Sequence, residues 1–188
     1  MNTINFYSGT SFNFVCPELS VFTIKDIAHA LSHLCRFTGH VRDFYSVAQH
    51  CVLVSHEVPT EFALHALMHD AAEAFTGDVS SPLKALLPDF QAIEASVERE
   101  VFTRFGLPIE LPGVIKRADR VLLLTEQRDL MCAGAKLEDA PRGLLPLENR
   151  ITTWFPSEAK RHFLRRFRDL AYQSEAAMKI DLEGVSRF

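Results

Sequence analysis

The sequence predicts an all-α fold with a small N-terminal β-hairpin. Three observations support this: apolar residues recur at helical spacing through most of the chain, cap and stop residues separate these segments, and strict alternation occurs only near the N-terminus. Residues 4–15 fit the hairpin, because Phe12 and Phe14 alternate with polar residues after the turn at Tyr7-Ser8-Gly9-Thr10. No repeat or linker divides the chain, so we expect one domain over residues 1–188.

The predicted helices follow one another with clear start and stop signals. Thr23 can cap a first helix that runs to about Arg36, and Phe37-Thr38-Gly39-His40 interrupts the pattern. Gly77 closes the third helix with a turn, and Ser81-Pro82 starts a short helix with Ser81 as its cap. The longer helices are expected at 23–36, 45–57, 59–75, 88–105, 113–131 and 157–178, with a loop that contains Gly134, Pro141, Gly143 and Pro146 before the last.

The composition is that of an ordinary globular domain, with 47% apolar and 23% charged residues. A net charge of −4 provides no basic field for nonspecific nucleic-acid binding. No apolar run approaches the roughly 20 residues that span a bilayer, and no signal peptide is apparent. The four cysteines form no CxxC pair, which indicates reduced, mostly buried thiols in a cytoplasmic protein. We therefore expect neither a nucleic-acid nor a membrane partner.

The most informative stretch is residues 65–78, at the end of the third predicted helix. His69, Asp70, Glu73 and Asp78 can all bind or steer a divalent cation, and they lie within ten residues. On a helix His69 and Asp70 point about 100° apart, so one cation can sit over the edge between them. Glu73 lies one turn further on, on the same side, where it can reach the water bound to that cation. The stretch therefore indicates half of a metal site.

The other ligands must come from other helices. His50 lies on the preceding helix, and Asp119 lies in a later apolar helix, where a carboxylate is costly to bury unless it is paired or ligates a metal. A set of imidazoles and carboxylates without thiolates suits a hydrolytic transition metal (Co, Mn, Fe or Zn) more than a structural zinc. Such a metal lowers the pKa of a water and polarises a phosphoryl oxygen. A second ion, if bound, would be Mg.

His65 stands four residues before His69, the spacing of the two histidines in a zinc-protease helix. That motif requires Glu directly after the first histidine, and position 66 is Ala. We therefore expect His65 to be structural or to lie beside the ligands.

Four segments in this order resemble the HD-domain metal-dependent phosphohydrolase superfamily. They are Ser46-Val47-Ala48-Gln49-His50, His69-Asp70-Ala71-Ala72-Glu73, Thr76-Gly77-Asp78-Val79-Ser80-Ser81-Pro82-Leu83-Lys84 and Lys116-Arg117-Ala118-Asp119. The pattern is similar to that of the bacterial 5′-deoxynucleotidases and of the phage enzymes that include dATP triphosphohydrolases. The resemblance covers about residues 23–130. It implies an all-α HD-domain helical bundle, a bound divalent metal and a homo-oligomer.

The resemblance also implies a role for each candidate site residue. The metal ligands would be His50, His69, Asp70 and Asp119. Glu73 would position or deprotonate the attacking water, and Asp78 would assist near the leaving oxygen or the sugar.

Substrate contacts are expected from residues that flank these ligands. Arg36-Phe37 resembles the Arg–aromatic pair that lines the nucleotide pocket of these enzymes, where Trp often stands in place of Phe37, and Phe can also stack on a base. Arg36, Arg42 and Lys84 are expected to contact phosphate, because a phosphate needs cationic donors.

The expected reaction is hydrolysis of 2′-deoxynucleotides at the α-phosphorus, with the 5′-oxygen as the leaving group. The short chain, the hairpin and the cations near Asp119 favour a phage-like triphosphohydrolase that converts dATP to deoxyadenosine and triphosphate. A 5′-deoxynucleotidase acting on monophosphates is the alternative, because the chemistry at the α-phosphorus is the same. A degenerate HD module that only senses a nucleotide would lack a ligand or Glu73, and none is missing.

Overall fold

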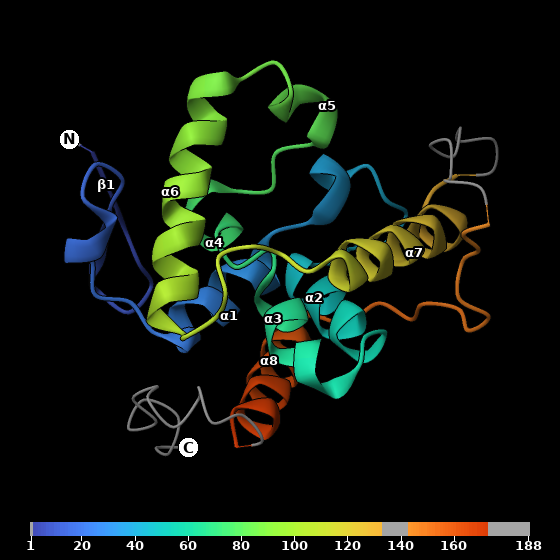
Figure 1. Ribbon diagram of the computed structural model, residues 1–188. Helices are drawn as coiled ribbons and strands as arrows, with labels where there is room; N and C mark the ends of the chain where they lie inside the picture. The colour runs from blue at the N-terminus through green and yellow to red at the C-terminus, as the bar shows by residue number, and fades with distance from the viewer. Residues whose placement is uncertain (1, 133–142, 173–188) are drawn as a thin grey trace.

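The structure is a computed structural model, and it describes residues 2–132 and 143–172. It is mostly helical with a two-stranded antiparallel sheet near the N-terminus, as predicted (Figure 1). The elements are β1 (Thr3–Asn5), β2 (Ser11–Asn13), the 3-10 helix η1 (Pro17–Leu19), α1 (Ile24–His33), the 3-10 helix η2 (Arg36–Gly39), α2 (Val47–His56), α3 (Thr60–Met68), α4 (Glu73–Thr76), α5 (Ser81–Lys84), α6 (Pro88–Arg104), α7 (Gly113–Leu130) and α8 (Pro156–Ala171).

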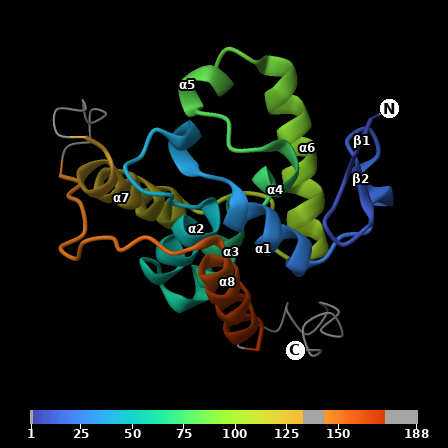
Figure 2. The same ribbon diagram turned by 180° about the vertical axis from the view of Figure 1, so that it is seen from behind.

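Helix α2 lies at the centre of the bundle. It packs against α1, α3, α7 and α8, and α8 also packs against α1 and α3 (Figures 1 and 2). Helix α6 stands to one side, where it contacts η1, α4 and α5. The main apolar core includes the fully buried side chains of Phe12, Phe102, Phe163 and Phe167, so the hairpin, α6 and α8 are joined by burial of aromatic surface.

Helices α1 and α2 begin at side-chain caps. The Asp26 carboxylate accepts hydrogen bonds from both the backbone N–H and the hydroxyl of Thr23, at 2.9 and 2.8 Å, which confirms the predicted start of α1. The hydroxyl of Ser46 accepts a hydrogen bond from the backbone N–H of Gln49 at 3.1 Å. These caps satisfy backbone donors that have no partner within the helix, and the second one fixes the start of the helix that carries His50.

The third predicted helix was expected to continue to about Phe75, and this is wrong. Helix α3 ends at Met68, and residues 69–72 form tight turns before the single turn of α4. The backbone N–H of Glu73, for example, donates to the carbonyl of Asp70, three residues back, at 3.0 Å, which is the tighter 3-10 pattern. Gly77 then ends α4 with a left-handed φ of 83°, as predicted.

Several smaller expectations also changed. The cap of α5 is Ser80 and not Ser81, so Pro82 is the second residue of this helix and not, as had been predicted, the first. The expectation that most cysteines are buried is wrong: all four are described and free, and only Cys51 is buried. The predicted loop residues Gly134 and Pro141 and the predicted helix end at Met178 lie outside the described residues. Within the described ranges, no helix has the length and apolar character needed to cross a bilayer.

Candidate metal centre

Two histidines and two carboxylates from three elements converge on one point. They are His50 on α2, His69 and Asp70 on the turn after α3, and Asp119 on α7. The Nε2 atom of His50 lies 3.2 Å from Asp119 Oδ1 and 3.6 Å from Asp70 Oδ2. His69 Nε2 lies 3.3 Å from the same Asp70 oxygen. Ligand atoms of His50, His69 and Asp119 all lie within 4.8 Å of one another, so these residues could hold one metal ion.

Hydrogen bonds fix which nitrogen of each imidazole faces this point. The Nδ1 atom of His50 lies 2.6 Å from Glu126 Oε1, and that of His69 lies 2.8 Å from the carbonyl oxygen of Ala66. Because both partners act as acceptors, each Nδ1 carries a hydrogen. Both Nε2 atoms are buried, and among the described residues neither has a hydrogen-bond partner. A metal ion would satisfy both of them, so the residues present fit the expected group.

Glu126 is a component of the site that the sequence reasoning missed. It is fully buried on α7 and accepts hydrogen bonds from His50 Nδ1, from the Tyr45 hydroxyl at 2.8 Å and from Arg36 Nη2 at 3.1 Å. It lies seven residues, about two helical turns, after Asp119, so both carboxylates project from one face of α7. The signal that pointed to Asp119, a carboxylate in an apolar helix, was also present at Glu126.

The charges of this network decide its protonation. Burial and the nearby Arg36 lower the pKa of His50, but the carboxylates of Glu126 and Asp119 outweigh them and raise it to about 9. Burial tends to raise the pKa of Glu126, yet Arg36 and His50 hold it below its usual value. Without a cation in the site, His50 therefore keeps a proton at neutral pH, and a metal ion must displace that proton to bind.

The proposed catalytic carboxylates lie beside these ligands. Burial, followed by repulsion from Asp70 and Asp78, raises the pKa of Glu73 well above its usual value. Its Oε2 atom is buried and has no hydrogen-bond partner in the described part of the chain. Asp78 is half-buried, and burial together with Asp70 raises its pKa despite the opposing charge of Arg36. Both carboxyl groups can therefore exchange protons closer to neutral pH than an exposed carboxylate can.

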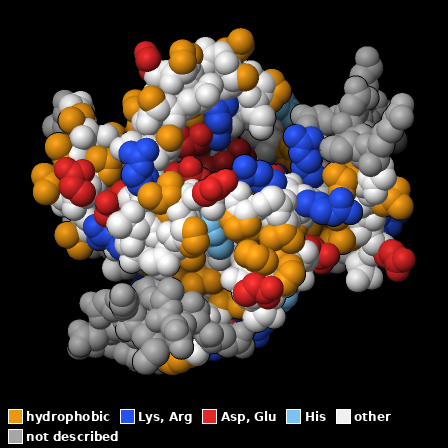
Figure 3. Space-filling view, viewed as in Figure 1, with side chains coloured by type: hydrophobic (Ala, Val, Ile, Leu, Met, Phe, Trp, Pro, Cys, Tyr) orange, Lys and Arg blue, Asp and Glu red, His pale blue; other side chains and the backbone are white. Residues whose placement is uncertain are grey.

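A cavity of about 310 Å³ opens beside the metal ligands. It is lined by His69, Asp70, Ala72, Glu73, Lys84, Gln91, Glu94, Ala95 and Glu98. Figure 3 shows acidic side chains gathered in a hollow on this face, with basic side chains around its rim. The structure thus brings Lys84 to the site, although its ammonium is 2.7 Å from a carboxylate oxygen of Glu94.

The other expected substrate contacts divide into two groups. Arg36 lies at the site, since its Nη1 is 3.6 Å from Asp70 Oδ2. Phe37 lies next to it, with its ring centroid 5.3 Å from the guanidinium carbon. Arg42 is instead exposed, and its guanidinium donates to the carbonyl oxygen of Asp129, about 15 Å along α7 from Asp119 by helical rise. The structure therefore does not bring Arg42 together with the predicted ligands.

Cys51 is close enough to form an alternative ligand group with His69 and Asp70. Burial, followed by the charges of Asp70 and Glu73, raises the pKa of the Cys51 thiol well above its usual value. Because metals bind the thiolate, this environment favours the group that contains His50 and Asp119.

Comparison with known proteins identifies relatives of this chain. It is 40% identical over 172 residues to the uncharacterized protein YfdR of Escherichia coli strain K12, and the aligned region covers 91% of this chain and 97% of that protein. An uncharacterized protein of Rhodobacter capsulatus is 36% identical over 121 residues, which cover 59% of this chain and 62% of that protein. A scan against models of protein families found no match. The chain therefore belongs to the same family as YfdR.

Proposed function

We propose that this protein is an HD-domain metal-dependent phosphohydrolase that cleaves 2′-deoxynucleotides at the α-phosphorus. The observation that carries the proposal is the pair of buried Nε2 atoms of His50 and His69, which lack hydrogen-bond partners among the described residues. Their Nδ1 atoms are already bonded, so each Nε2 can bind a divalent cation beside Asp70 and Asp119, once His50 has released the second proton that it holds at neutral pH. Two imidazoles and two carboxylates suit Co, Mn, Fe or Zn.

The bound cation would supply Lewis-acid polarisation of the phosphoryl group and activation of a water. Glu73 orients the attacking water and accepts its proton as the new oxygen–phosphorus bond forms, a role that suits its buried, unusually basic carboxyl group. Asp78 donates a proton to the 5′-oxygen as the bond from phosphorus to that oxygen breaks. Arg36, held by Glu126, offers a fixed positive charge to the phosphate.

We propose dATP as the substrate, with deoxyadenosine and triphosphate as products. Exposed basic side chains precede and follow Asp119 on α7 and can attract a polyphosphate; they are Lys116, Arg117 and Arg120. A specific observation favours deoxynucleoside monophosphates as the second candidate. The cavity beside the ligands carries Glu94 and Glu98, and Lys84 is already paired with Glu94, so its walls repel a polyphosphate that enters.

The test uses the full chain, stripped with EDTA and reloaded with Co²⁺, Mn²⁺, Fe²⁺ or Zn²⁺, with products from dATP and dAMP separated by ion-exchange chromatography. Triphosphate released from dATP supports the first candidate, and phosphate released from dAMP alone supports the second. The variant Asp70→Ala should lose turnover, whereas Asp43→Ala, which changes an exposed aspartate, should keep it. If neither dATP nor dAMP is turned over with any of these metals, the proposed enzymatic function is wrong. Light scattering on the same sample tests the proposed homo-oligomer.

A further inference from the structure

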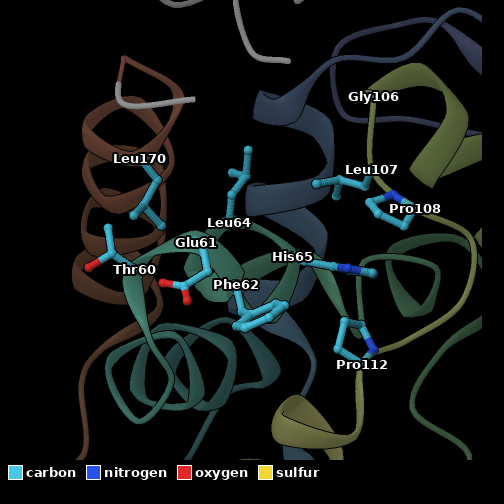
Figure 4. A pocket seen from close by; sticks show the side chains of 10 residues that line it. All are labelled: Thr60, Glu61, Phe62, Leu64, His65, Gly106, Leu107, Pro108, Pro112 and Leu170. Atoms are coloured by element: carbon cyan, nitrogen blue, oxygen red, sulfur yellow. The ribbon is translucent and has the colours of Figure 1, made fainter. Parts of the chain in front are cut away.

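Two cavities formed by described residues lie away from the metal centre. The one drawn in Figure 4, of about 610 Å³, lies between α3, α8 and the connection from α6 to α7, and its walls are mainly apolar. The other, of about 310 Å³, lies between α2, α8 and the segment that leads into α8, which Figure 2 draws in orange. Arginine side chains line this α2–α8 cavity and not the first, so it offers a ligand a defined charge.

Arg166 places a fixed positive charge in the wall of the α2–α8 cavity. Its Nε and Nη2 atoms donate to the hydroxyl and carbonyl oxygens of Ser55, at 3.0 and 2.8 Å, so α2 holds the guanidinium in one orientation. Both acceptors are uncharged, and among the described residues no carboxylate forms an ion pair with Arg166. Burial lowers the pKa of Arg166 more than the charge of Asp169 raises it. An anion in the cavity would compensate this charge.

A second guanidinium and two imidazoles line the same cavity. Arg165 follows the same rule as Arg166, because it has no ion-pair partner among the described residues. Its Nη2 atom lies 3.2 Å from Nδ1 of His162, and since arginine can only donate, the hydrogen of His162 is on Nε2. Burial, followed by the charge of nearby arginines, lowers the pKa of both His162 and His56. Each imidazole is therefore uncharged at neutral pH and has one N–H to donate.

The acidic side chain of the lining does not neutralise these arginines. Asp169 is the one described lining residue with a carboxylate, and its Oδ1 atom lies 3.5 Å from Nη2 of Arg168, which is not part of the lining. The Asp169 side chain is also 52% exposed, so water and salt screen its charge. The lining thus carries two arginines against one carboxylate that is paired outside it.

The donors come from two helices, which suits a tetrahedral oxyanion. Arg165 and Arg166 are adjacent on α8 and point about 100° apart, so one anion can sit over the edge between them. His56 lies on the facing wall, at the end of α2. A phosphate accepts from several directions, and the fork of donors on arginine matches its oxygens. Val52 and Leu53 add an aliphatic wall against which a short organic group can pack.

We propose that the α2–α8 cavity binds a small phosphate, either inorganic phosphate or a compact phosphate monoester. The phosphate group lies between the guanidinium groups of Arg165 and Arg166, and His56 donates to it from the facing helix. In a monoester, the organic group packs against Val52 and Leu53. The proposal is independent of the reaction assigned to the metal centre, with which this cavity shares no described lining residue.

Trp154 reports on this site, because it lines the cavity and is the single tryptophan of the chain. The full chain is stripped of metal with EDTA, desalted and titrated at low salt while the Trp154 fluorescence is followed. The probes are inorganic phosphate, butyl phosphate and, as the matched uncharged molecule, 1-butanol. At least one phosphate should give a saturable change with a Kd below about 1 mM, and 1-butanol should give none. Binding of butyl phosphate that is tighter by about fivefold or more assigns monoesters, and any smaller ratio assigns inorganic phosphate.

Variants on α8 test the two guanidinium groups. Arg165→Gln, at an exposed position, should weaken phosphate binding at least about tenfold. Arg161→Gln makes the same charge change one turn earlier, at an exposed residue outside the lining, and should bind like the unmodified protein. Arg166→Gln should also weaken binding about tenfold, with its folding checked by circular dichroism.

Three results would overturn the proposal. They are the absence of a saturable Trp154 change with either phosphate up to about 1 mM, binding of 1-butanol as tight as that of the phosphates, and equal affinities of Arg165→Gln and Arg161→Gln. Unchanged affinity in folded Arg166→Gln also contradicts it. If that variant does not fold because it loses the bonds to Ser55, the comparison of the other two variants decides.

Discussion

Replacing Glu126 by alanine removes the acceptor of three buried hydrogen bonds, from His50, Tyr45 and Arg36. Arg36 then keeps only the Asp70 carboxylate, 3.6 Å away, as an ion-pair partner among the described residues. Removing one partner of a buried ion pair costs about 3–5 kcal/mol, because the other charge stays buried without compensation. The free energy of unfolding of the metal-free protein should therefore fall by about 3–5 kcal/mol.

The same substitution should weaken metal binding. Glu126 holds the hydrogen on Nδ1 of His50 and so presents Nε2 to the cation. Loss of such a supporting residue typically lowers metal affinity about 10–100-fold. Glu126→Gln should lower stability less, by about 1–3 kcal/mol, because the amide keeps one acceptor oxygen. The remaining loss arises because the amide NH₂ must face at least one of the three donors.

Two measurements check these values. Urea denaturation in EDTA gives the free energy of unfolding, and a Co²⁺ titration followed by visible absorbance gives the affinity. Glu110→Ala, which removes an exposed glutamate, is the control and should change neither value. If Glu126→Ala unfolds within about 1 kcal/mol of the unmodified protein and binds Co²⁺ with the same affinity, the role assigned to the buried network is wrong.

Three further predictions concern single groups. Asp119→Asn should weaken Co²⁺ binding at least about tenfold by calorimetry, and it should also lower the stability of the metal-free protein, because it removes a carboxylate paired with protonated His50; equal affinity would exclude it as a ligand. The pKa of His50 is raised to about 9, so the metal-free protein should be most stable below its ordinary value of 6.5. It should lose about 3 kcal/mol as the pH rises through 9, a slope that urea denaturation should not find in His50→Gln. Thr23→Ala should lower thermal stability by about 1 kcal/mol through loss of a hydroxyl bond to Asp26, without changing Co²⁺ affinity.

Much of the helical framework could be predicted because its signals are local. The cap at Thr23, the positive φ at Gly77 and the alternation of Phe12 and Phe14 each depend on a few neighbouring residues. The break after Met68 could not be predicted in this way. Residues 64–76 contain neither Gly nor Pro, and several alanines there favour a continuous helix. The tighter turns lie where Ala71, Ala72 and Phe75 are buried in the core, and a local sequence pattern does not specify such tertiary packing.

The convergence of His50, His69, Asp70 and Asp119 was expected from ordered motifs, and the structure brings these four side chains together. Arg42 illustrates the limit of such reasoning. Its position in the sequence, close to Arg36, suggested a phosphate contact, but a short loop carries it to the far end of α7. Tertiary contacts between residues almost 90 positions apart decide its location, and sequence spacing says nothing about them.

The most direct test of metal-dependent phosphohydrolysis is a titration of the EDTA-stripped chain with Co²⁺, in which bound metal and dATP turnover are measured on the same samples. We expect turnover to rise in proportion to occupancy of the site formed by His50, His69, Asp70 and Asp119, and to stop rising when that site is full. Asp70→Ala should abolish both signals. Turnover that persists in EDTA, or saturated metal binding with no hydrolysis of dATP or dAMP, would contradict the proposed function.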